Sequence, residues 1–159
     1  MLTWQNTDKS KWEDGPWTQE PDKAQWIDEA TGLDCLIVRG PRGALCGYVG
    51  VPKGHPAYQQ GYSDVDAEVH GSLTFADACQ PTNDPSRGIC HLEESAANKT
   101  VWWLGFDCAH HCDLSPADEG RYRGDGSYRN FSYVQNECMS LAAQLAKMSG
   151  NAVSQTHGT

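Results

Sequence analysis

The sequence predicts an α+β fold, in which a single antiparallel sheet, a meander of about five to six strands, packs with one C-terminal amphipathic helix. Short apolar runs separated by turns that contain Gly and Pro fill the first half of the chain, which is typical of strands joined by hairpins. Residues 101–107 alternate between two faces, as a strand does. From Asn130 onward, apolar residues recur at steps of four and three, which indicates an amphipathic helix. Long polar stretches between these elements predict a loop-rich domain.

The chain of 159 residues fits one domain, preceded by an irregular arm and followed by a flexible tail. We expect an irregular N-terminal arm at residues 1–22, a single α+β domain at residues 23–149, and a flexible tail at residues 150–159. The arm carries Trp4, Trp12 and Trp17 among charged and turn-forming residues, with no period of a strand or helix. These tryptophans predict that the arm packs on the domain.

Six segments have the pattern of strands. They are residues 23–28, 33–39, 44–51, 69–75, 88–92 and 101–107. In residues 69–75 the alternation places His70 on the open side of the sheet. The helix is expected to begin after Asn130, a plausible N-cap, and to end at Gly150. Its apolar stripe consists of Val134, Cys138, Leu141, Leu145 and Met148.

Composition limits the classes of partner. The net charge of -9 repels phosphate backbones and anionic membranes, and the sequence has no Lys/Arg cluster. We therefore expect no membrane binding, and nonspecific nucleic-acid binding is disfavoured. Neither a signal peptide nor a run approaching about 18 apolar residues is present, which predicts a cytoplasmic protein. The seven cysteines form no CxxC pair, so we expect Cys35, Cys46 and Cys138 to be small buried hydrophobes in a reducing compartment.

The segment Val101–Asp113 predicts a functional site. Its bulky apolar strand ends at Asp107, and the loop after it supplies two thiols, two imidazoles and a second carboxylate. A rigid strand that delivers polar groups to a loop at its own end suits binding or catalysis.

One interpretation of these groups is a metal site. Imidazole, thiolate and carboxylate bind zinc and similar ions, but one short segment seldom supplies a whole coordination sphere. Other ligands would come from strand ends elsewhere in the sheet. The predicted ligands of a divalent metal, zinc or magnesium, are His70, His91, Asp107, His110 and Asp113. In the alternative interpretation His55 and His91 bond to backbone at turns, and Cys108 and Cys112 belong to the core.

The same residues support a metal-free site. Asp107 could orient His110 or His70, and that imidazole would act as a general acid or base near neutral pH. We therefore predict His70, Asp107 and His110 as catalytic residues. A weaker alternative makes Cys108 or Cys112 a nucleophile. Ligand contacts are expected from His55, Tyr58 and Trp103, of which Trp103 could form the floor of a pocket.

Several known signatures are absent. His70-Gly-Ser72 has the His-x-Ser form of two-histidine phosphoesterases, but no second His-x-Ser/Thr follows it. The sequence also has no GxxxxGK[ST], HExxH or GxSxG motif.

Six groups of motifs spread over residues 22–146 carry a family resemblance. They are Thr31-Gly-Leu followed by Cys-Leu-Ile-Val-Arg-Gly, Gly47-Tyr-Val-Gly-Val-Pro with Gly54-His-Pro, Val69-His-Gly, Ile89-Cys-His, Trp102-Trp-x-Gly-Phe-Asp-Cys-Ala-His with Asp113, and Tyr133-Val-x-x-Glu-Cys. Together they resemble a family of phage- and prophage-encoded proteins without an assigned activity. The resemblance implies a phage setting, and hence the host cell cytoplasm.

The resemblance also implies a shared polar set that is similar to an active or ligand site. The residues that match the family's motifs are His55, His70, His91, Asp107, His110 and Asp113. His111 and Cys112 stand where small residues are more usual in the family, which argues against a Cys-His-His-Cys metal cluster.

Three functions are compatible with these observations. The first is a small phage-encoded hydrolase that acts on a phosphorylated or nucleotide-like small molecule through a His/Asp site, with a bound metal or as an acid/base set. The second is a non-catalytic counter-defence protein that sequesters a small signal molecule or blocks a host protein. A virion or assembly component ranks last, because the sequence has no repeat, coiled coil or sticky edge.

Overall fold

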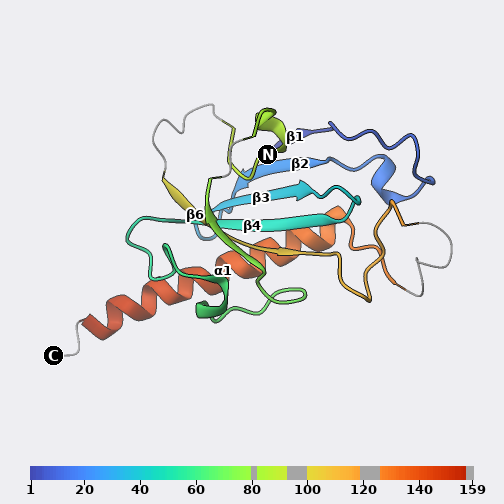
Figure 1. Cartoon of the computed structure of the whole chain (residues 1–159). Helices are drawn as coiled ribbons and strands as arrows, with labels where there is room; N and C mark the ends of the chain where they lie inside the picture. The colour runs from blue at the N-terminus through green and yellow to red at the C-terminus, as the bar shows by residue number, and fades with distance from the viewer. Residues whose placement is uncertain (80–81, 93–99, 119–125, 157–159) are drawn as a thin grey trace.

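The computed structural model describes residues 1–79, 82–92, 100–118 and 126–156, and it confirms the α+β class. One antiparallel sheet has the strand order β1-β2-β3-β4-β6-β5, and one long helix crosses it (Figure 1). The strands are β1 (Leu2–Trp4), β2 (Lys23–Ile27), β3 (Asp34–Arg39), β4 (Leu45–Pro52), β5 (Phe75–Ala78) and β6 (Val101–Asp107). The helix is α1 (Phe131–Thr156), and short 3-10 turns are η1 (Pro16–Thr18), η2 (Tyr62–Asp64) and η3 (Pro85–Arg87).

The sheet is a meander only as far as β4. Strand β6 pairs with β4, with Gly47 opposite Phe106, and β5 pairs with the other edge of β6. Strand β6 is therefore internal, and β4 pairs with it as far as Asp107, whereas β5 pairs only with residues 102–105. The alternation predicted for β6 is confirmed, since Leu104 and Phe106 face α1 while Trp103 is on the opposite face.

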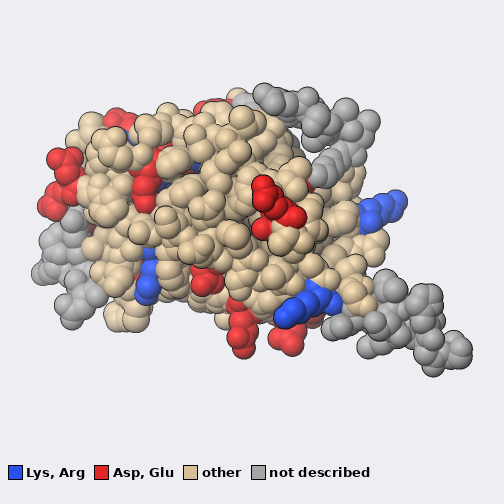
Figure 2. All heavy atoms as spheres, turned by 180° about the vertical axis from the view of Figure 1, so that it is seen from behind, with Lys and Arg blue, Asp and Glu red and all other residues tan. Residues whose placement is uncertain are grey.

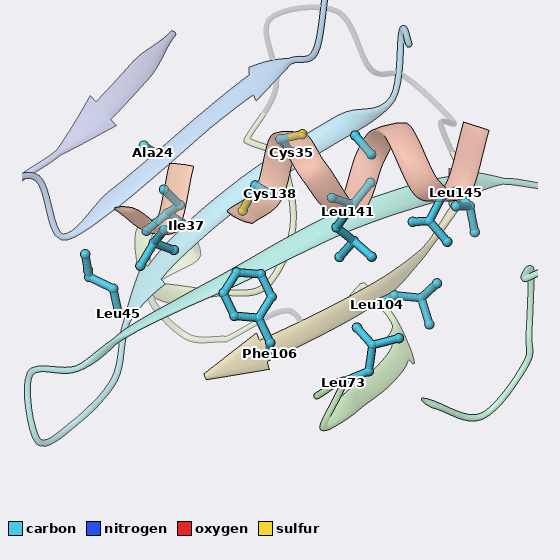
Figure 3. Close-up of a cluster of buried hydrophobic side chains, with 14 of the residues drawn as sticks. Ala24, Cys35, Ile37, Leu45, Leu73, Leu104, Phe106, Cys138, Leu141 and Leu145 are labelled. Atoms are coloured by element: carbon cyan, nitrogen blue, oxygen red, sulfur yellow. The ribbon is translucent and has the colours of Figure 1, made fainter. Parts of the chain in front are cut away.

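Helix α1 packs on the sheet through the predicted stripe. Val134, Cys138, Leu141 and Leu145 are fully buried, and Figure 3 shows several of these side chains between the helix and the strands. A Cβ atom added at Gly47 would lie 2.7 Å from Cys138 Sγ, so this glycine permits the close approach of helix and sheet.

Both ends of α1 can be compared with the prediction. The N-cap is confirmed, because the Tyr133 N–H donates to Asn130 Oδ1 at 2.8 Å. The helix does not end at Gly150 as expected, but continues to Thr156 and projects beyond the sheet (Figure 1). A glycine inside a helix costs only about 1 kcal/mol relative to alanine, which is too little by itself to stop one.

The face of the sheet opposite α1 carries a smaller core of Leu36, Tyr48 and Trp103, and Ile89 packs against it. The strand expected at residues 88–92 does not form. Instead, side chains of β2 hold this segment: Lys23 Nζ donates to the Gly88 carbonyl at 2.8 Å, and the Gln25 amide makes two hydrogen bonds with the Leu92 backbone.

A disulfide joins Cys79 to Cys90 at the two sides of the loop that precedes this segment. The sequence did not predict the bond. The other five cysteines are free, and Cys35 and Cys138 are buried as expected, whereas Cys46 is half-buried.

The strand predicted at residues 69–75 is also wrong in its first half. The Ser72 N–H donates to the Val69 carbonyl at 3.0 Å and closes a tight turn, in which Gly71 and Ser72 have φ of 65° and 69°. Such left-handed backbone cannot continue a strand. Strand β5 therefore begins only at Phe75, and His70 occupies a turn.

Part of the arm expected to be irregular joins the sheet, because β1 pairs with β2 at its edge. The arm packs on the domain through the buried Trp17. Its C-terminal end is fixed by Asp22, whose carboxylate accepts hydrogen bonds from Arg39 Nε at 2.6 Å and from two N–H groups of residues 6 and 7.

One face of the molecule carries dispersed charges. On the face seen in Figure 2, acidic side chains are spread over the surface, with a few Lys and Arg side chains among them. Within the described ranges, α1 and the other helical segments are too short or too polar to cross a membrane.

Candidate functional site

Three segments distant in sequence converge beside the C-terminal end of β6. They are the turn at residues 69–72, the loop at residues 108–113, and residues 129–133 at the start of α1. Each has a local cause: left-handed backbone at Gly71, the end of β6 at Asp107, and the N-cap Asn130.

Asp113 is the centre of the cluster. Its Oδ2 atom accepts three hydrogen bonds, from His70 Nε2 at 2.8 Å, from His110 Nδ1 at 3.1 Å and from the His110 N–H at 3.0 Å. Its Oδ1 atom accepts one from Arg129 Nε at 3.0 Å. The side chain is only 1% exposed, so these donors replace water around a buried charge.

These contacts fix the ionisation of Asp113. Burial opposes the charged form, but hydrogen bonds from His70, the His110 N–H and Arg129 outweigh it and lower the pKa of Asp113 to about 2. Asp113 is therefore a carboxylate near neutral pH and can only accept hydrogen bonds.

His70 is held at both ring nitrogens. Nε2 donates its proton to the Asp113 carboxylate, so in the neutral ring Nδ1 is the acceptor, and it lies 2.9 Å from the Tyr133 hydroxyl. The His70 N–H also donates to Glu137 Oε2 at 3.1 Å. Because both ring nitrogens are occupied and the side chain is 13% exposed, His70 serves as a support within the cluster.

His110 is the accessible member. Its Nδ1 proton points to Asp113, which leaves the lone pair of Nε2 on the neutral ring, and 37% of the side chain is exposed. The ring lies against Gly71, where an added Cβ would be 2.1 Å from His110 Cε1. A carboxylate therefore orients an imidazole whose second nitrogen can accept a proton, which is the arrangement of a general base and its orienting group.

Asp107 lies at the edge of this arrangement. Its oxygens accept hydrogen bonds from Thr74 Oγ1 at 3.0 Å and from the Ala109 N–H at 3.1 Å, and Oδ1 lies 3.7 Å from His110 Nε2. Asp107 is thus close to His110, but the hydrogen bond that orients this ring is donated to Asp113.

Two contributors were not predicted from the sequence. Arg129 contacts Asp113, and its guanidinium lies 5.1 Å from the centre of the Tyr133 ring. Tyr133 could have been found, because it occupies the first turn of the predicted helix and a motif of the resemblance. Arg129 lies in a polar, Gly-rich stretch that has no pattern to distinguish it.

Other predicted site residues lie elsewhere. His91 is on the opposite face of the sheet, 2.7 Å from the Cys35 carbonyl and with its ring 5.3 Å from that of Trp103. His55 is buried beside α1, where Nδ1 accepts from the Ala57 N–H and Nε2 lies 2.7 Å from the Leu145 carbonyl. Both histidines therefore match the interpretation in which they bond to backbone.

The residues expected to contact a ligand do not come together either. Trp103 is fully buried, and Tyr58 is half-buried with its ring 6.4 Å from that of Trp102. Neither is among the residues that contact the Asp113 cluster in the part of the chain that the structure describes.

Of the five predicted metal ligands, His70, His110 and Asp113 come together. One donor atom from each lies within 4.8 Å of the others, so these residues could hold a metal ion. Two imidazoles and a carboxylate are a donor set suited to zinc and similar ions.

The Cys108 thiol gives little support for a cysteine nucleophile. Burial, with nearby carboxylates, raises the pKa of the Cys108 thiol far above its usual value, so its reactive thiolate is not formed near neutral pH. Cys112 is exposed on the loop.

Comparison of the chain with protein families, with characterised proteins and with solved structures found no match.

Proposed function

We propose that the protein is a small hydrolase that acts on a phosphorylated or nucleotide-like small molecule, with His110 as its general base. The observation that carries this proposal is the pair formed by Asp113 and His110. The carboxylate accepts the Nδ1 proton over 3.1 Å, and 37% of the His110 side chain is exposed, with Nε2 lying 3.7 Å from Asp107 Oδ1. Such pairs activate water in enzymes and contribute about 10²–10⁴-fold to rate.

In this reaction His110 Nε2 accepts a proton from a water molecule as the water oxygen bonds to the phosphorus atom. The bond from phosphorus to the leaving oxygen then breaks, and the imidazolium can return its proton to that oxygen. Asp113 remains ionised throughout, because its pKa is about 2, and it stabilises the positive charge on the ring.

Arg129 supports an anionic substrate. Its Nε–H donates to Asp113, while its side chain is 28% exposed. A guanidinium held in this way can present its remaining N–H groups to a phosphoryl oxygen, a geometry that arginine favours.

A metal-dependent form of the same site is the second version of the proposal. Zinc fits the donors of His70, His110 and Asp113 better than magnesium does, because magnesium favours oxygen ligands. Bound there, zinc would supply a water of lowered pKa as the nucleophile. Arg129 beside Asp113 adds a positive charge that opposes cation binding, which favours the metal-free version.

Phage origin and the host cell cytoplasm remain part of the proposal, supported by the resemblance of the motifs. The Cys79–Cys90 disulfide argues against a location in the cytoplasm, because disulfides persist mainly in oxidising environments.

The test is hydrolysis of p-nitrophenyl thymidine 5′-phosphate and p-nitrophenyl phosphate by untagged protein. We expect His110→Ala to lower kcat/KM about 10²–10⁴-fold. His111→Ala is the matched control, because it removes an exposed imidazole from the next position and should leave the rate within about twofold. Failure of the wild type to hydrolyse either ester, or equal effects of the two substitutions, would contradict the proposal.

Metal content separates the two versions. Elemental mass spectrometry before and after chelation, with zinc added back, is measured alongside the rate. Activity that survives chelation supports the acid/base version, whereas activity lost on chelation and restored by zinc supports the metal version.

A further inference from the structure

The N-terminal arm reaches the site through the residues on either side of Arg129. Tyr128 and Phe131 flank this arginine and its neighbour Asn130, and both contact the same arm residue, Glu20. The Tyr128 hydroxyl donates to Glu20 Oε1 at 2.5 Å, and the Phe131 N–H donates to Glu20 Oε2 at 2.7 Å. The two carboxylate oxygens of Glu20 therefore hold the chain on both sides of Arg129.

Other contacts make this attachment rigid. The Tyr128 hydroxyl accepts a hydrogen bond from Arg39 Nη1 at 3.0 Å, and the Tyr128 ring packs edge-on against Trp17 with 5.0 Å between ring centres. Arg39 Nη2 is 3.8 Å from the Glu20 carboxylate, and the Arg39 side chain is fully buried. Glu20 is itself only 15% exposed, so water does not easily replace it.

Arg129 needs such support. A free arginine side chain loses rotamer freedom when it is held in one place, and its hydrogen bond to Asp113 must offset that loss. If the backbone on both sides of Arg129 is fixed, less freedom is lost when the guanidinium meets Asp113 at 3.0 Å and covers the Tyr133 ring.

We propose that Glu20 is a positioning residue of the candidate site, and that it acts through Arg129 on Asp113. The arm then contributes to the geometry of the site in addition to packing on the domain. The inference rests on the proposed function only for its effect on turnover, and its structural claim is testable without a substrate.

The experiment follows the Nε–H signal of Arg129 by ¹H–¹⁵N NMR, assigned by its loss in Arg129→Lys. Hydrogen exchange at this group reports the bond to Asp113. In the wild type we expect Nε–H exchange at least about tenfold slower than at Arg42, whose side chain is 68% exposed and contacts Asp118 through Nη2.

Three variants distinguish positioning from general stabilisation. Glu20→Ala should speed exchange at Arg129 about tenfold, whereas Glu20→Gln, which keeps one acceptor oxygen, should have an intermediate effect. Asn6→Ala is the matched control, because it removes a different arm contact, the hydrogen bonds from Asn6 Nδ2 to Ser86 at 3.0 and 3.1 Å, and leaves the Glu20 carboxylate in place. It should leave the Arg129 signal unchanged.

Protection of the backbone N–H groups in β4 serves as the reference for folding. If Glu20→Ala remains folded and Arg129 exchanges as slowly as in the wild type, the proposal is wrong. It is also wrong if Asn6→Ala has as large an effect as Glu20→Ala. If Glu20→Ala does not fold, Glu20→Gln decides alone, and an unchanged Arg129 signal overturns the proposal.

Failure of this inference and failure of the proposed function are distinguishable, because the exchange measurement needs no hydrolysis. If the protein is a hydrolase, Glu20→Ala should also lower kcat/KM for p-nitrophenyl thymidine 5′-phosphate, with partial rescue in Glu20→Gln.

Discussion

Asp113 accepts four hydrogen bonds on a carboxylate that is almost completely buried, and this makes the stability of the protein depend on pH. Its pKa is about 2 in the folded state, below the usual value of 3.8, so its ionisation stabilises the fold above about pH 4. This contribution, about 2.5 kcal/mol, is lost as the pH falls from 4 to 2.

Urea unfolding of the wild type and Asp113→Asn between pH 7 and pH 2.5 measures this effect. The wild type should be more stable at pH 7, and the difference should shrink by about 2 kcal/mol at the acid end. A difference that does not change with pH would show that Asp113 ionises normally.

Gly71 tests the position of the His110 ring. An alanine there would have its Cβ 2.1 Å from His110 Cε1 and would also be strained at φ of 65°. Gly71→Ala should displace the ring and lower activity, in addition to a strain of about 1–3 kcal/mol.

The control is Gly32→Ala, which has a similar φ of 73° and open space around the added Cβ. Both variants should lose stability in urea unfolding, and only Gly71→Ala should change the His110 NMR signals. Equal changes at His110 would contradict the steric role of Gly71.

The residues of the cluster could be predicted only in part. His70, His110 and Asp113 stand out because imidazoles and carboxylates follow apolar strand patterns. Whether Asp107 or Asp113 is the partner of His110 could not be predicted, because it depends on how the loop after β6 turns back. That turn is fixed by the Asp113 N–H, which donates to the His110 carbonyl at 2.9 Å.

Among the elements, the segment at residues 79–92 depends on a covalent link. The Cys79–Cys90 bond closes a loop over a sequence separation of 11 residues, which restricts the unfolded chain. Replacing both cysteines by serine should therefore destabilise the protein by about 2–4 kcal/mol.

Urea unfolding of the double variant and of reduced wild-type protein measures this contribution. The two should agree, and Cys112→Ser, which removes an exposed free thiol, should be neutral. Equal stability of the oxidised and reduced wild type would mean that hydrogen bonds from Lys23 and Gln25 are enough to hold the segment.

Elements with a strong period were predicted well, and the exceptions have local causes. The stripe of α1 and strands β2, β3, β4 and β6 follow the sequence pattern closely. Residues 69–72 alternate like a strand, but the left-handed backbone at Gly71 and Ser72 turns the chain. Gly71 was the one available signal, because glycine favours such conformations.

At the scale of the whole molecule, the arm and the domain share one buried charge network. Arg39 is fully buried, and its Nε donates to Asp22 at 2.6 Å, while Asp22 also accepts hydrogen bonds from the N–H groups of residues 6 and 7. Sequence patterns cannot pair these residues, because Asp22 is 17 residues from Arg39 and Tyr128 is 89 residues from it. The sequence did predict that the arm packs on the domain through its tryptophans, and the buried Trp17 confirms this prediction.

Removal of residues 1–22 should therefore destabilise the domain strongly. Arg39 would be left as a buried charge without its partner, a change that typically costs about 3–5 kcal/mol. Thermal unfolding followed by circular dichroism measures the loss. A truncated protein as stable as the full chain would mean that the arm only rests on the surface.

The most direct test of the proposed site is the protonation state of His110, measured by ¹⁵N NMR of its imidazole near neutral pH. If Asp113 orients this ring, the neutral form carries its proton on Nδ1, Nε2 is the basic nitrogen, and Asp113→Asn weakens this preference. A neutral His110 with its proton on Nε2, or a ring with no preference in the wild type, would contradict the role of His110 as a general base held by Asp113.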